Sequence, residues 1–244
     1  MSTKVQLKDC GRISYKDAWE LQTRLFGRSN DLKIFNRSHK DQAQPIANYL
    51  LFCEHNHVYT LGKSGHEENL LVQSDVLAEQ GIEFFHTNRG GDITYHGPGQ
   101  ITGYPILDLE QFFTDVHKYM RYLEDVIILT CAHYGVEAGR CPGQTGVWVD
   151  YDKGARARKI CALGVHMGRW ITMHGFGFNI NSDLQKFDLI VPCGIVDKGV
   201  TSLAAETGRE IDMQEVKEVI ARNFAEVFSA DLVEFREEEL PAAP

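Results

Sequence analysis

The stretch Arg89-Gly-Gly-Asp-Ile-Thr-Tyr-His-Gly-Pro-Gly-Gln100 is the most informative part of this 244-residue chain. It holds four glycines, one proline and two side chains that can carry a positive charge, Arg89 and His96. Glycine loses more backbone freedom on folding than any other residue, so this density is costly in a purely structural element. It is typical of a backbone that a ligand approaches closely. The stretch, called the glycine block below, is a candidate site, with a polar hairpin turn as the alternative.

The glycine block interrupts a region rich in strand patterns. Residues Ile82 to His86 lead directly into it, and Ile101 to Leu109 resume a strand pattern after it. Upstream, the aromatic and aliphatic run from Tyr49 to Leu61 predicts one strand that ends at Gly62. On that strand the pair His55-x-His57 would point both rings to one face, but no third ligand lies at a telling distance, so we expect no metal site.

The rest of the chain mixes helix and strand patterns. Helices are expected over Tyr15 to Phe26, Asp75 to Gln80, Asp115 to Tyr134, Val200 to Glu206 with a Thr201 or Ser202 cap, and after the Asp212 and Glu215 capping box. Strands are expected over Gly146 to Tyr151 and Lys159 to Asn181, with breaks near Gly168 and Gly175. Because helices and strand groups do not alternate regularly, we expect an α+β fold: a single domain with a mixed, mainly antiparallel sheet flanked by helices.

Composition restricts the setting in which the protein works. The formal charge of −9 argues against nucleic-acid binding, and no apolar run reaches the roughly 18 to 20 residues of a membrane span. The N-terminus resembles neither a signal peptide nor a presequence, so we expect a cytoplasmic protein. The six cysteines form no C-x-x-C pair and are expected to be free thiols. We expect a domain over residues 1–234 and a loose acidic tail over 235–244.

One basic run stands out against the acidic composition. Between Lys153 and Arg169 there are five cations and no acid after position 152. A solvated loop is the ordinary interpretation of such a run. The alternative is a landing surface, together with Arg89, for an acidic partner protein.

Cys193 has the surroundings of a nucleophile. The run Phe187-Asp-Leu-Ile-Val-Pro-Cys-Gly-Ile195 passes from a strand pattern to a thiol between a proline and a glycine, which predicts presentation at a turn. A thiol near backbone N–H groups and a cation has a lowered pKa. Lys159, which opens an apolar strand, is one candidate cation, and His96 and His174 are alternatives. The competing interpretation of Cys193 is a buried side chain that fills space.

The chain resembles the lipoyl(octanoyl) transferase family in four motifs. They are the glycine block, Lys159-Ile-Cys-Ala-Leu-Gly164, His174-Gly-Phe-Gly-Phe-Asn179 and Pro192-Cys-Gly194. The resemblance implies the catalytic-domain fold of biotin and lipoate protein ligases. It implies transfer of an octanoyl group from octanoyl-acyl carrier protein to a lysine of lipoyl domains or of the glycine-cleavage H protein. It also implies a domain of that activity over residues 1–234, no cofactor, and a monomer that binds neither nucleic acid nor membrane.

The resemblance also assigns residues. It implies an acyl-thioester cysteine at Cys193 and a lysine that lowers its pKa at Lys159. The implied substrate-binding residues are Arg89, Gly90, Gly91, Asp92, Ile93, Thr94, Tyr95, His96, Ala162, Leu163, Gly164, His174, Gly175, Phe176 and Gly177. Three alternatives remain open from the sequence: an ATP-dependent lipoate-protein ligase, a cysteine thioesterase or hydrolase, and a non-catalytic protein that holds an acyl chain.

Overall fold

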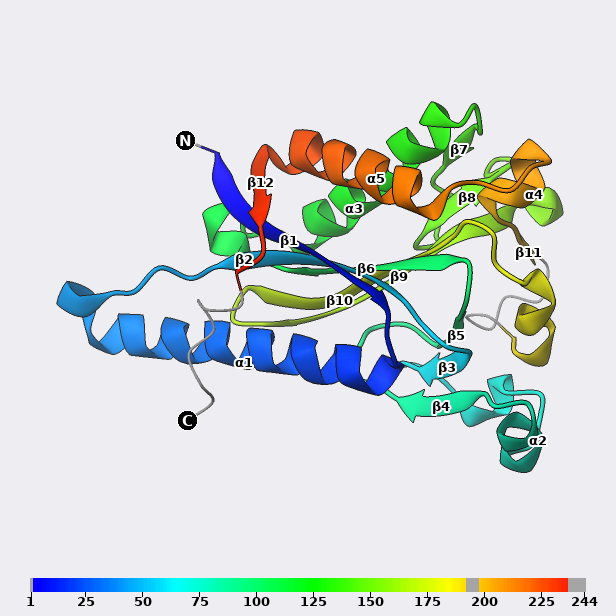
Figure 1. Ribbon diagram of the computed structural model, residues 1–244, viewed down its shortest axis with the longest axis horizontal. Helices are drawn as coiled ribbons and strands as arrows, with labels where there is room; N and C mark the ends of the chain where they lie inside the picture. The colour runs from blue at the N-terminus through cyan, green and yellow to red at the C-terminus, as the bar shows by residue number, and fades with distance from the viewer. Residues whose placement is uncertain (1, 192–197, 237–244) are drawn as a thin grey trace.

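The large sheet forms the centre of the molecule (Figure 1). The computed structural model describes residues 2–191 and 198–236, and within them nine strands pair in the order β12-β1-β2-β6-β10-β9-β8-β7, with β11 beside β9. These strands are β1 (Thr3–Arg12), β2 (Asn48–Glu54), β6 (Gln100–Ile106), β7 (Ala138–Gly139), β8 (Val147–Val149), β9 (Arg158–Gly168), β10 (Ile171–Asn179), β11 (Gly199–Val200) and β12 (Ala230–Glu234). Strand β1 is parallel to β2 and β12, and β11 is parallel to β9, whereas the other neighbours are antiparallel. The predicted α+β class with a mixed, mainly antiparallel sheet is confirmed.

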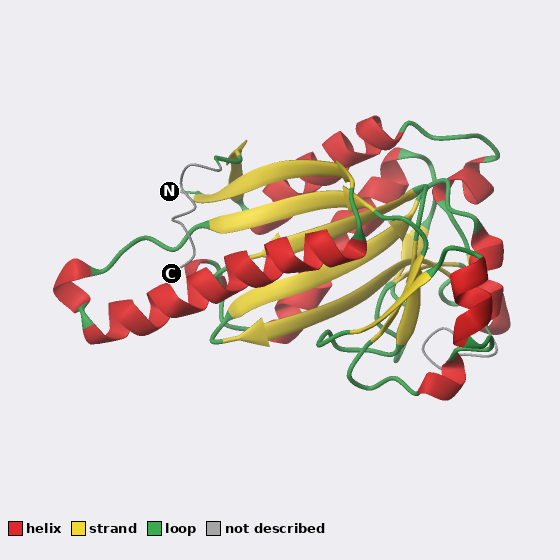
Figure 2. Cartoon of the chain, turned by 60° about the horizontal axis from the view of Figure 1, so that its bottom comes forward, coloured by secondary structure: helices red, strands yellow, loops and turns green. Residues whose placement is uncertain are grey.

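Helices cover both faces of this sheet (Figures 1 and 2). Helix α1 (Tyr15–Ser38) lies on one face, and α3 (Val116–His133) and α5 (Met213–Phe228) lie together on the other. The core follows from this arrangement, since one apolar cluster joins α3 and α5 to the sheet and a second joins α1 to it. The shorter helical segments are η1 (Lys40–Gln42), η2 (Glu67–Asn69), α2 (Ser74–Glu79), η3 (Leu109–Gln111), η4 (Gly154–Arg156), η5 (Leu184–Leu189) and α4 (Leu203–Thr207).

The predicted strand over Tyr49 to Leu61 is wrong, because the chain there forms two strands in two sheets. Strand β2 ends at Glu54, and β3 (Val58–Leu61) belongs to a small sheet with β4 (Glu83–His86) and β5 (Ile93–His96) in the order β4-β3-β5. The turn between β2 and β3 is fixed by His55, which is fully buried and lies 2.9 Å from the Ile13 carbonyl oxygen. The sequence did not predict this turn, because the residues on both sides of it are apolar and buried.

Two other predicted boundaries differ from the structure. Helix α1 continues past Gly27 to Ser38, since a single helical glycine costs only about 1 kcal/mol and the later turns are anchored by the buried Lys33. Strand β10 runs through Gly175, where a break was expected, and the irregularity takes the form of a positive φ of 60° at His174.

The predicted helix starts at Asp115 and Asp212 and the predicted Ser202 cap are confirmed. Asp115 and Asp212 accept hydrogen bonds from backbone N–H groups in the first turns of α3 and α5, and Ser202 does the same for α4. Gly208 ends α4 in the left-handed conformation with φ of 70°. These helix ends could be predicted from the sequence, because a cap involves only residues that are close together in the chain.

Phe235 and Arg236 lie at the end of the described chain. The backbone N–H of Phe235 donates to the Leu7 carbonyl oxygen, and that of Arg236 donates to the Gln6 side chain, so both residues are tied to β1. The rest of the expected tail lies outside the described residues. Across 2–191 and 198–236, every helix is too short or too polar to cross a membrane.

Candidate active site

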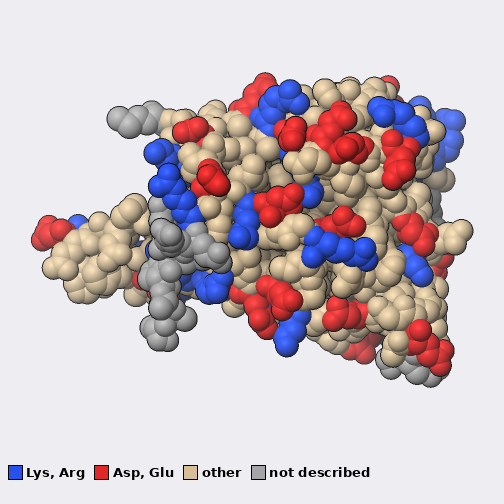
Figure 3. Space-filling model, in the orientation of Figure 1, with Lys and Arg blue, Asp and Glu red and all other residues tan. Residues whose placement is uncertain are grey.

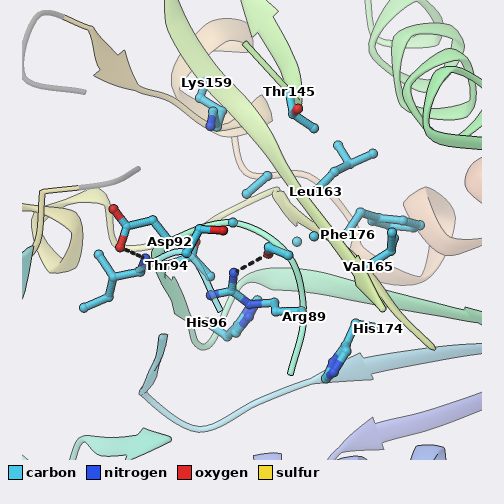
Figure 4. A pocket seen from close by; sticks show the side chains of 18 of the residues that line it. Arg89, Asp92, Thr94, His96, Thr145, Lys159, Leu163, Val165, His174 and Phe176 are labelled. Carbon is cyan, nitrogen blue, oxygen red and sulfur yellow. Dashed lines mark hydrogen bonds between the residues drawn. The ribbon is translucent and has the colours of Figure 1, made fainter. Parts of the chain in front are cut away.

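A cavity of about 720 Å³ opens where the glycine block meets strands β9 and β10 (Figure 4). Its lining includes Lys159 and every predicted substrate-binding residue except Tyr95. Figure 4 shows Lys159 and Thr145 on one side of this cavity and Arg89, His96 and His174 on the other. The predicted residues that line it, which extend from Arg89 to Gly177 in the sequence, thus share one chamber.

The cavity exists because strand β9 has an incomplete edge. Strand β8 pairs with β9 as far as Cys161, and further along the Gly90 N–H donates a 2.8 Å hydrogen bond to the Val165 carbonyl oxygen. Between these two contacts the edge formed by Ala162, Leu163 and Gly164 borders the cavity. The glycine block therefore closes one end of a gap that β8 closes at the other.

Two glycines are required where backbones approach one another. A Cβ atom on Gly164 would lie 2.8 Å from the Gly90 carbonyl oxygen, and one on Gly175 would collide with the Gly103 carbonyl oxygen. Both distances are shorter than ordinary van der Waals contacts. Glycine at these positions lets β9 approach the glycine block and lets β10 approach β6.

Arg89 is a buried anchor of the glycine block. Its side chain is 7% exposed and donates to the Thr60 carbonyl oxygen at 2.5 Å, to the Thr60 hydroxyl at 2.9 Å and to the Gly90 carbonyl oxygen at 3.1 Å. These bonds tie the block to strand β3 of the small sheet. The guanidinium therefore holds the cavity wall in place and brings a positive charge to its lining.

Asp92 ties the glycine block to the η2 segment. One carboxylate oxygen accepts hydrogen bonds from the backbone N–H groups of His66 and Ile93, and the other accepts a 2.6 Å bond from the Asn69 side chain. Ser64, His66 and Asn69 line the same side of the cavity. The carboxylate is therefore occupied by internal contacts that shape the cavity wall.

His96 and His174 are buried and neutral. Burial lowers the pKa of each imidazole to about 3, and the nearby Arg89 cation acts in the same direction. His96 Nδ1 donates to the Gln100 side-chain oxygen at 2.7 Å, and His174 Nε2 donates to the Asn88 side-chain oxygen at 2.6 Å. A general base works best with a pKa near the working pH, so these rings suit orientation and shape better than proton transfer.

Tyr95 does not border the cavity. It is fully buried, its hydroxyl lies 2.7 Å from His57 Nδ1, and its ring packs against Phe187 on the far side of the small sheet. Side chains alternate between the faces of a strand, so Tyr95 points away from the side occupied by its neighbours Thr94 and His96.

The prediction that His55 and His57 share a face is wrong. His55 Nε2 accepts from the Tyr104 hydroxyl at 2.7 Å, whereas His57 contacts Tyr95. Both lie in the turn between β2 and β3, where the alternation of a strand does not apply. Within the described chain no three His, Cys, Asp or Glu side chains are grouped as metal ligands.

Lys159 is held on both sides of β9. Its backbone pairs with Trp148 of β8 and with Val200 of β11, and its carbonyl oxygen accepts from the Thr201 N–H at 2.9 Å. Its ammonium lies 4.7 Å from the centroid of the Trp148 ring, which is a cation–π contact. The side chain thus lines the cavity with its charged end resting on an aromatic face.

Cys193 lies outside the described residues, but the chain on each side of its segment is described. The Val191 N–H donates to the Asn69 carbonyl oxygen at 2.8 Å, and Gly199 and Val200 form β11 beside Lys159. Asn69 and Lys159 both line the cavity. The described residues on the two sides of Cys193, Val191 and Val200, therefore each pair with a residue that lines the cavity.

The cations of residues 153–169 do not form one surface. Lys153 and Arg158 both pair with Asp150, and Arg158 also binds Glu206 at 2.7 Å. Asp150, which lies three residues before Lys153, and Glu206, which is distant in the sequence, thus compensate two of the five cations. On the face drawn in Figure 3, Lys and Arg side chains are likewise interspersed with Asp and Glu. The alternative interpretation of one uncompensated basic surface is therefore not supported, and binding of an acidic partner there stays a prediction.

The cations of the basic run are also spread along strand β9. Lys159 and Arg169 lie near opposite ends of β9, and residues of a strand are spaced by about 3.3 Å. Arg89, which was expected to join the surface, is buried in the cavity wall, whereas Arg156 is exposed.

Several cavity residues were not anticipated from the sequence. They are Tyr15 at the start of α1, Tyr104 of β6, Met120 of α3, the loop 143–145, Val165 of β9, and Ser64, His66 and Asn69. Each comes from an element whose own pattern indicates only a helix, a strand or a loop. No local signal marks them, because contacts between separate elements bring them to the cavity.

The chain is similar to known proteins over most of its length. A family model described as the lipoyl protein ligase A/B catalytic domain matches residues 14–225. The octanoyltransferase of Flavobacterium johnsoniae is 56% identical over 234 residues, which cover 96% of this chain and 100% of that protein. Such identity over the full length shows common family membership.

Solved structures with the same fold are more distant in sequence. A bi-partite lipoate protein ligase from Thermoplasma acidophilum has a TM-score of 0.70 at 15% identity, with 98% of this chain and 90% of that chain covered. A biotin protein ligase from Aquifex aeolicus has a TM-score of 0.51 at 13% identity, with 93% and 70% covered. These likenesses confirm the predicted fold of biotin and lipoate protein ligases. The cavity, the motifs that line it and the full-length identity together place this chain in the lipoyl protein ligase A/B catalytic-domain family, among the octanoyltransferases, which are acyltransferases of protein lipoylation.

Proposed function

We propose that residues 1–234 are an octanoyltransferase domain that works in the cytoplasm through an acyl-thioester on Cys193. The donor is octanoyl-acyl carrier protein, and the acceptor is a lysine of a lipoyl domain or of the glycine-cleavage H protein. The proposal rests on the following observation. Lys159 and the acyl-binding motifs line one cavity, and the described residues on both sides of the Cys193 segment attach to the wall of that cavity.

The first step exchanges one thioester for another. The Cys193 thiolate attacks the carbonyl carbon of the octanoyl thioester, the new C–S bond forms, and the bond to the carrier's sulfur breaks. The carrier leaves as a thiolate that takes up the proton of the Lys159 ammonium, so that Lys159 is neutral when the acceptor amine attacks. Because a thioester is made and a thioester is broken, this step is nearly balanced in free energy and needs no ATP.

The second step forms an amide. The amine of the acceptor lysine attacks the Cys193 thioester, the C–N bond forms and the C–S bond breaks, which regenerates the thiolate. Lys159 stabilises that thiolate as its ion-pair partner, and in its neutral form it takes the proton that the attacking amine releases. Backbone N–H groups near Cys193 stabilise the oxyanion of both steps. The amide product is more stable than the thioester, so this step drives the reaction.

The octanoyl chain lies along the open edge of β9. Leu163, Val165 and Phe176 supply apolar surface there, and Met120 adds to it from α3. Each buried CH₂ contributes roughly 0.8 kcal/mol of binding free energy, so the cavity can discriminate between acyl chains of different length. Arg89, His96 and His174 orient and shape the site.

A Cys–His hydrolase is less consistent with the same geometry. The bases that the sequence suggests for it are His96 and His174, and burial lowers the pKa of both to about 3. At neutral pH such an imidazole is too weak a base to activate a thiol or a water molecule efficiently.

The proposal is tested by transfer without ATP. Wild type, Cys193→Ala and Lys159→Met would be incubated with octanoyl-acyl carrier protein and a lipoyl domain, and octanoylated lipoyl domain would be quantified by intact mass. We expect transfer by wild type, none by Cys193→Ala and at least about tenfold slower transfer by Lys159→Met. Transfer only from free octanoate with ATP would instead establish a ligase, and release of octanoate without transfer would establish a hydrolase.

A further inference from the structure

Glu124 is a buried carboxylate outside the cavity lining. It lies on the inner face of α3 and is 0% exposed, between the buried Leu123 and Val126. Burying a carboxylate costs several kcal/mol unless it is paired and hydrogen-bonded, so an apolar residue would suit this face better for stability alone. The partners of Glu124 therefore indicate what the carboxylate holds in place.

Those partners connect α3 to the loop before β8. One carboxylate oxygen of Glu124 accepts bonds from Arg140 Nε at 2.7 Å and from an Arg121 nitrogen at 2.9 Å. The other accepts a 3.1 Å hydrogen bond from the Gly146 backbone N–H. The carboxylate thus fixes the exact point at which the chain enters β8.

Gly146 is packed against Lys159. It has a φ of 112°, and a Cβ atom there would lie 2.6 Å from the Cys161 carbonyl oxygen and 3.4 and 3.5 Å from the last two methylene carbons of Lys159. Two residues later, the Trp148 ring lies under the Lys159 ammonium. The entry to β8 therefore contacts both the stem and the charged end of the lysine.

We infer that Glu124 is a positioning residue that holds Lys159 at the cavity through Gly146 and the start of β8. The inference rests on the proposed role of Lys159 as the ion-pair partner of the Cys193 thiolate. If the Gly146 N–H loses its acceptor, the entry to β8 loosens, and Lys159 loses its packing surface and its aromatic support. An ion pair weakens as its charges separate, so the thiolate is then less stabilised.

Two substitutions at Glu124 distinguish the loss of its hydrogen-bond acceptor from the loss of its charge and from a change in side-chain volume. Glu124→Gln keeps an oxygen that can accept from the Gly146 N–H but removes the charge. Glu124→Leu keeps a similar volume and removes the acceptor. We expect Glu124→Gln to stay within about threefold of the wild-type kcat, and Glu124→Leu to fall at least about tenfold with little change in KM, because misplacement of a catalytic group mainly costs kcat.

Gly146→Ala tests the contact with Lys159 directly and has a matched control. Gly135→Ala places a side chain at a comparable positive φ of 74°, but with no atom within 4 Å of its Cβ and at the end of α3, away from the cavity lining. Both alanines place a side chain at a positive φ, but only that of Gly146→Ala meets the Cys161 carbonyl oxygen and the Lys159 stem. A loss of kcat confined to Gly146→Ala therefore reports displacement of the entry to β8 from β9 and Lys159. This pair also keeps the test valid if Glu124→Leu fails to fold.

The deciding readout is the pH dependence of Cys193 alkylation by iodoacetamide, followed by peptide mass spectrometry. We expect Lys159→Met to raise the pH midpoint of the Cys193 alkylation rate by about one pH unit. Glu124→Leu and Gly146→Ala should move it in the same direction, whereas Glu124→Gln and Gly135→Ala should match wild type. If Lys159→Met shifts the midpoint and neither Glu124→Leu nor Gly146→Ala does, the positioning role is wrong while the proposed function stands. An unshifted Lys159→Met would overturn both the role of Lys159 and this inference.

Discussion

The side chain of Asn69 donates a 2.6 Å hydrogen bond to the Asp92 carboxylate, and the carbonyl oxygen of the same Asn69 accepts a 2.8 Å bond from Val191. Asp92 belongs to the glycine block, and Val191 is two residues before Cys193. The cavity wall and the described chain that precedes the proposed nucleophile are therefore connected through one residue, which uses its side chain for Asp92 and its main-chain carbonyl for Val191.

Asn69→Ala should slow acylation of the enzyme by about tenfold, since a hydrogen bond to a charged group contributes about 1.5 to 3 kcal/mol. Single-turnover acylation by octanoyl-acyl carrier protein, followed by intact mass, measures this. Asn36→Ala is the control, because Asn36 makes two hydrogen bonds with the Gln44 backbone far from the cavity. Equal acylation rates for the two variants would contradict the expectation.

Lys33 should dominate the stability of the α1 packing. Its ammonium is buried and lies 2.5 Å from Asp108 and 3.1 Å from Glu110. Lys33→Ala leaves the buried Asp108 without its partner and should lower the free energy of unfolding by about 3 to 5 kcal/mol. Urea denaturation measures the change.

The exposed pair Lys16 and Glu20 provides the control for Lys33, because both of its side chains are more than 60% exposed. Lys16→Ala should change the free energy of unfolding by less than about 0.5 kcal/mol. If Lys33→Ala lowers the free energy of unfolding by no more than this, the buried ion pair contributes little to stability.

Stability should fall as the pH is lowered from about 6.5, the ordinary pKa of histidine, toward about 3. The folded pKa values of His96 and His174 are about 3, so in this window protons bind the unfolded imidazoles but not the folded ones. Each histidine then lowers the free energy of unfolding by up to about 1.4 kcal/mol per pH unit, and its contribution is intact above pH 6.5. His96→Gln should reduce the slope by about one proton in urea titrations at pH 4 to 6; an unchanged slope would show that the ring is protonated in the fold.

Gly164→Ala should impair acyl transfer, because its Cβ would lie 2.8 Å from the Gly90 carbonyl oxygen and 3.2 Å from Arg89 Cδ. We expect kcat/KM for the octanoyl donor to fall by at least about tenfold, the effect of displacing a binding wall by a fraction of an ångström to one ångström. Gly27→Ala, inside α1 with open space around its Cβ, should keep full activity and gain about 0.5 to 1 kcal/mol of stability. Full activity in Gly164→Ala would contradict the close approach described here.

The sequence predicted much of the site because the motifs fall on adjacent elements. Strands β9 and β10 form one hairpin, and the glycine block pairs with the edge of β9 at Val165, so the three motifs predicted to bind the acyl chain converge through near-neighbour contacts. Helix ends were equally readable, because a cap such as Asp212 acts on the first turn that follows it.

The parts that were missed depend on contacts between distant segments. The split of the run from Tyr49 to Leu61 depends on His55 reaching Ile13, and the pairing of Arg158 depends on Glu206, which is 48 positions away. The link from Glu124 to Gly146 joins α3 to β8 across 22 positions. No periodicity in the sequence marks a pairing of this kind.

The central claim is that the octanoyl group passes through a thioester on Cys193. It is tested most directly by incubating wild-type protein with octanoyl-acyl carrier protein alone, without ATP or acceptor, and mapping the octanoyl adduct by peptide mass spectrometry. The account predicts one adduct on the Cys193 peptide that hydroxylamine removes, that a lipoyl domain discharges, and that Cys193→Ala lacks. An adduct on Cys161 or Lys159 instead, or no adduct while transfer to the lipoyl domain proceeds, would contradict it.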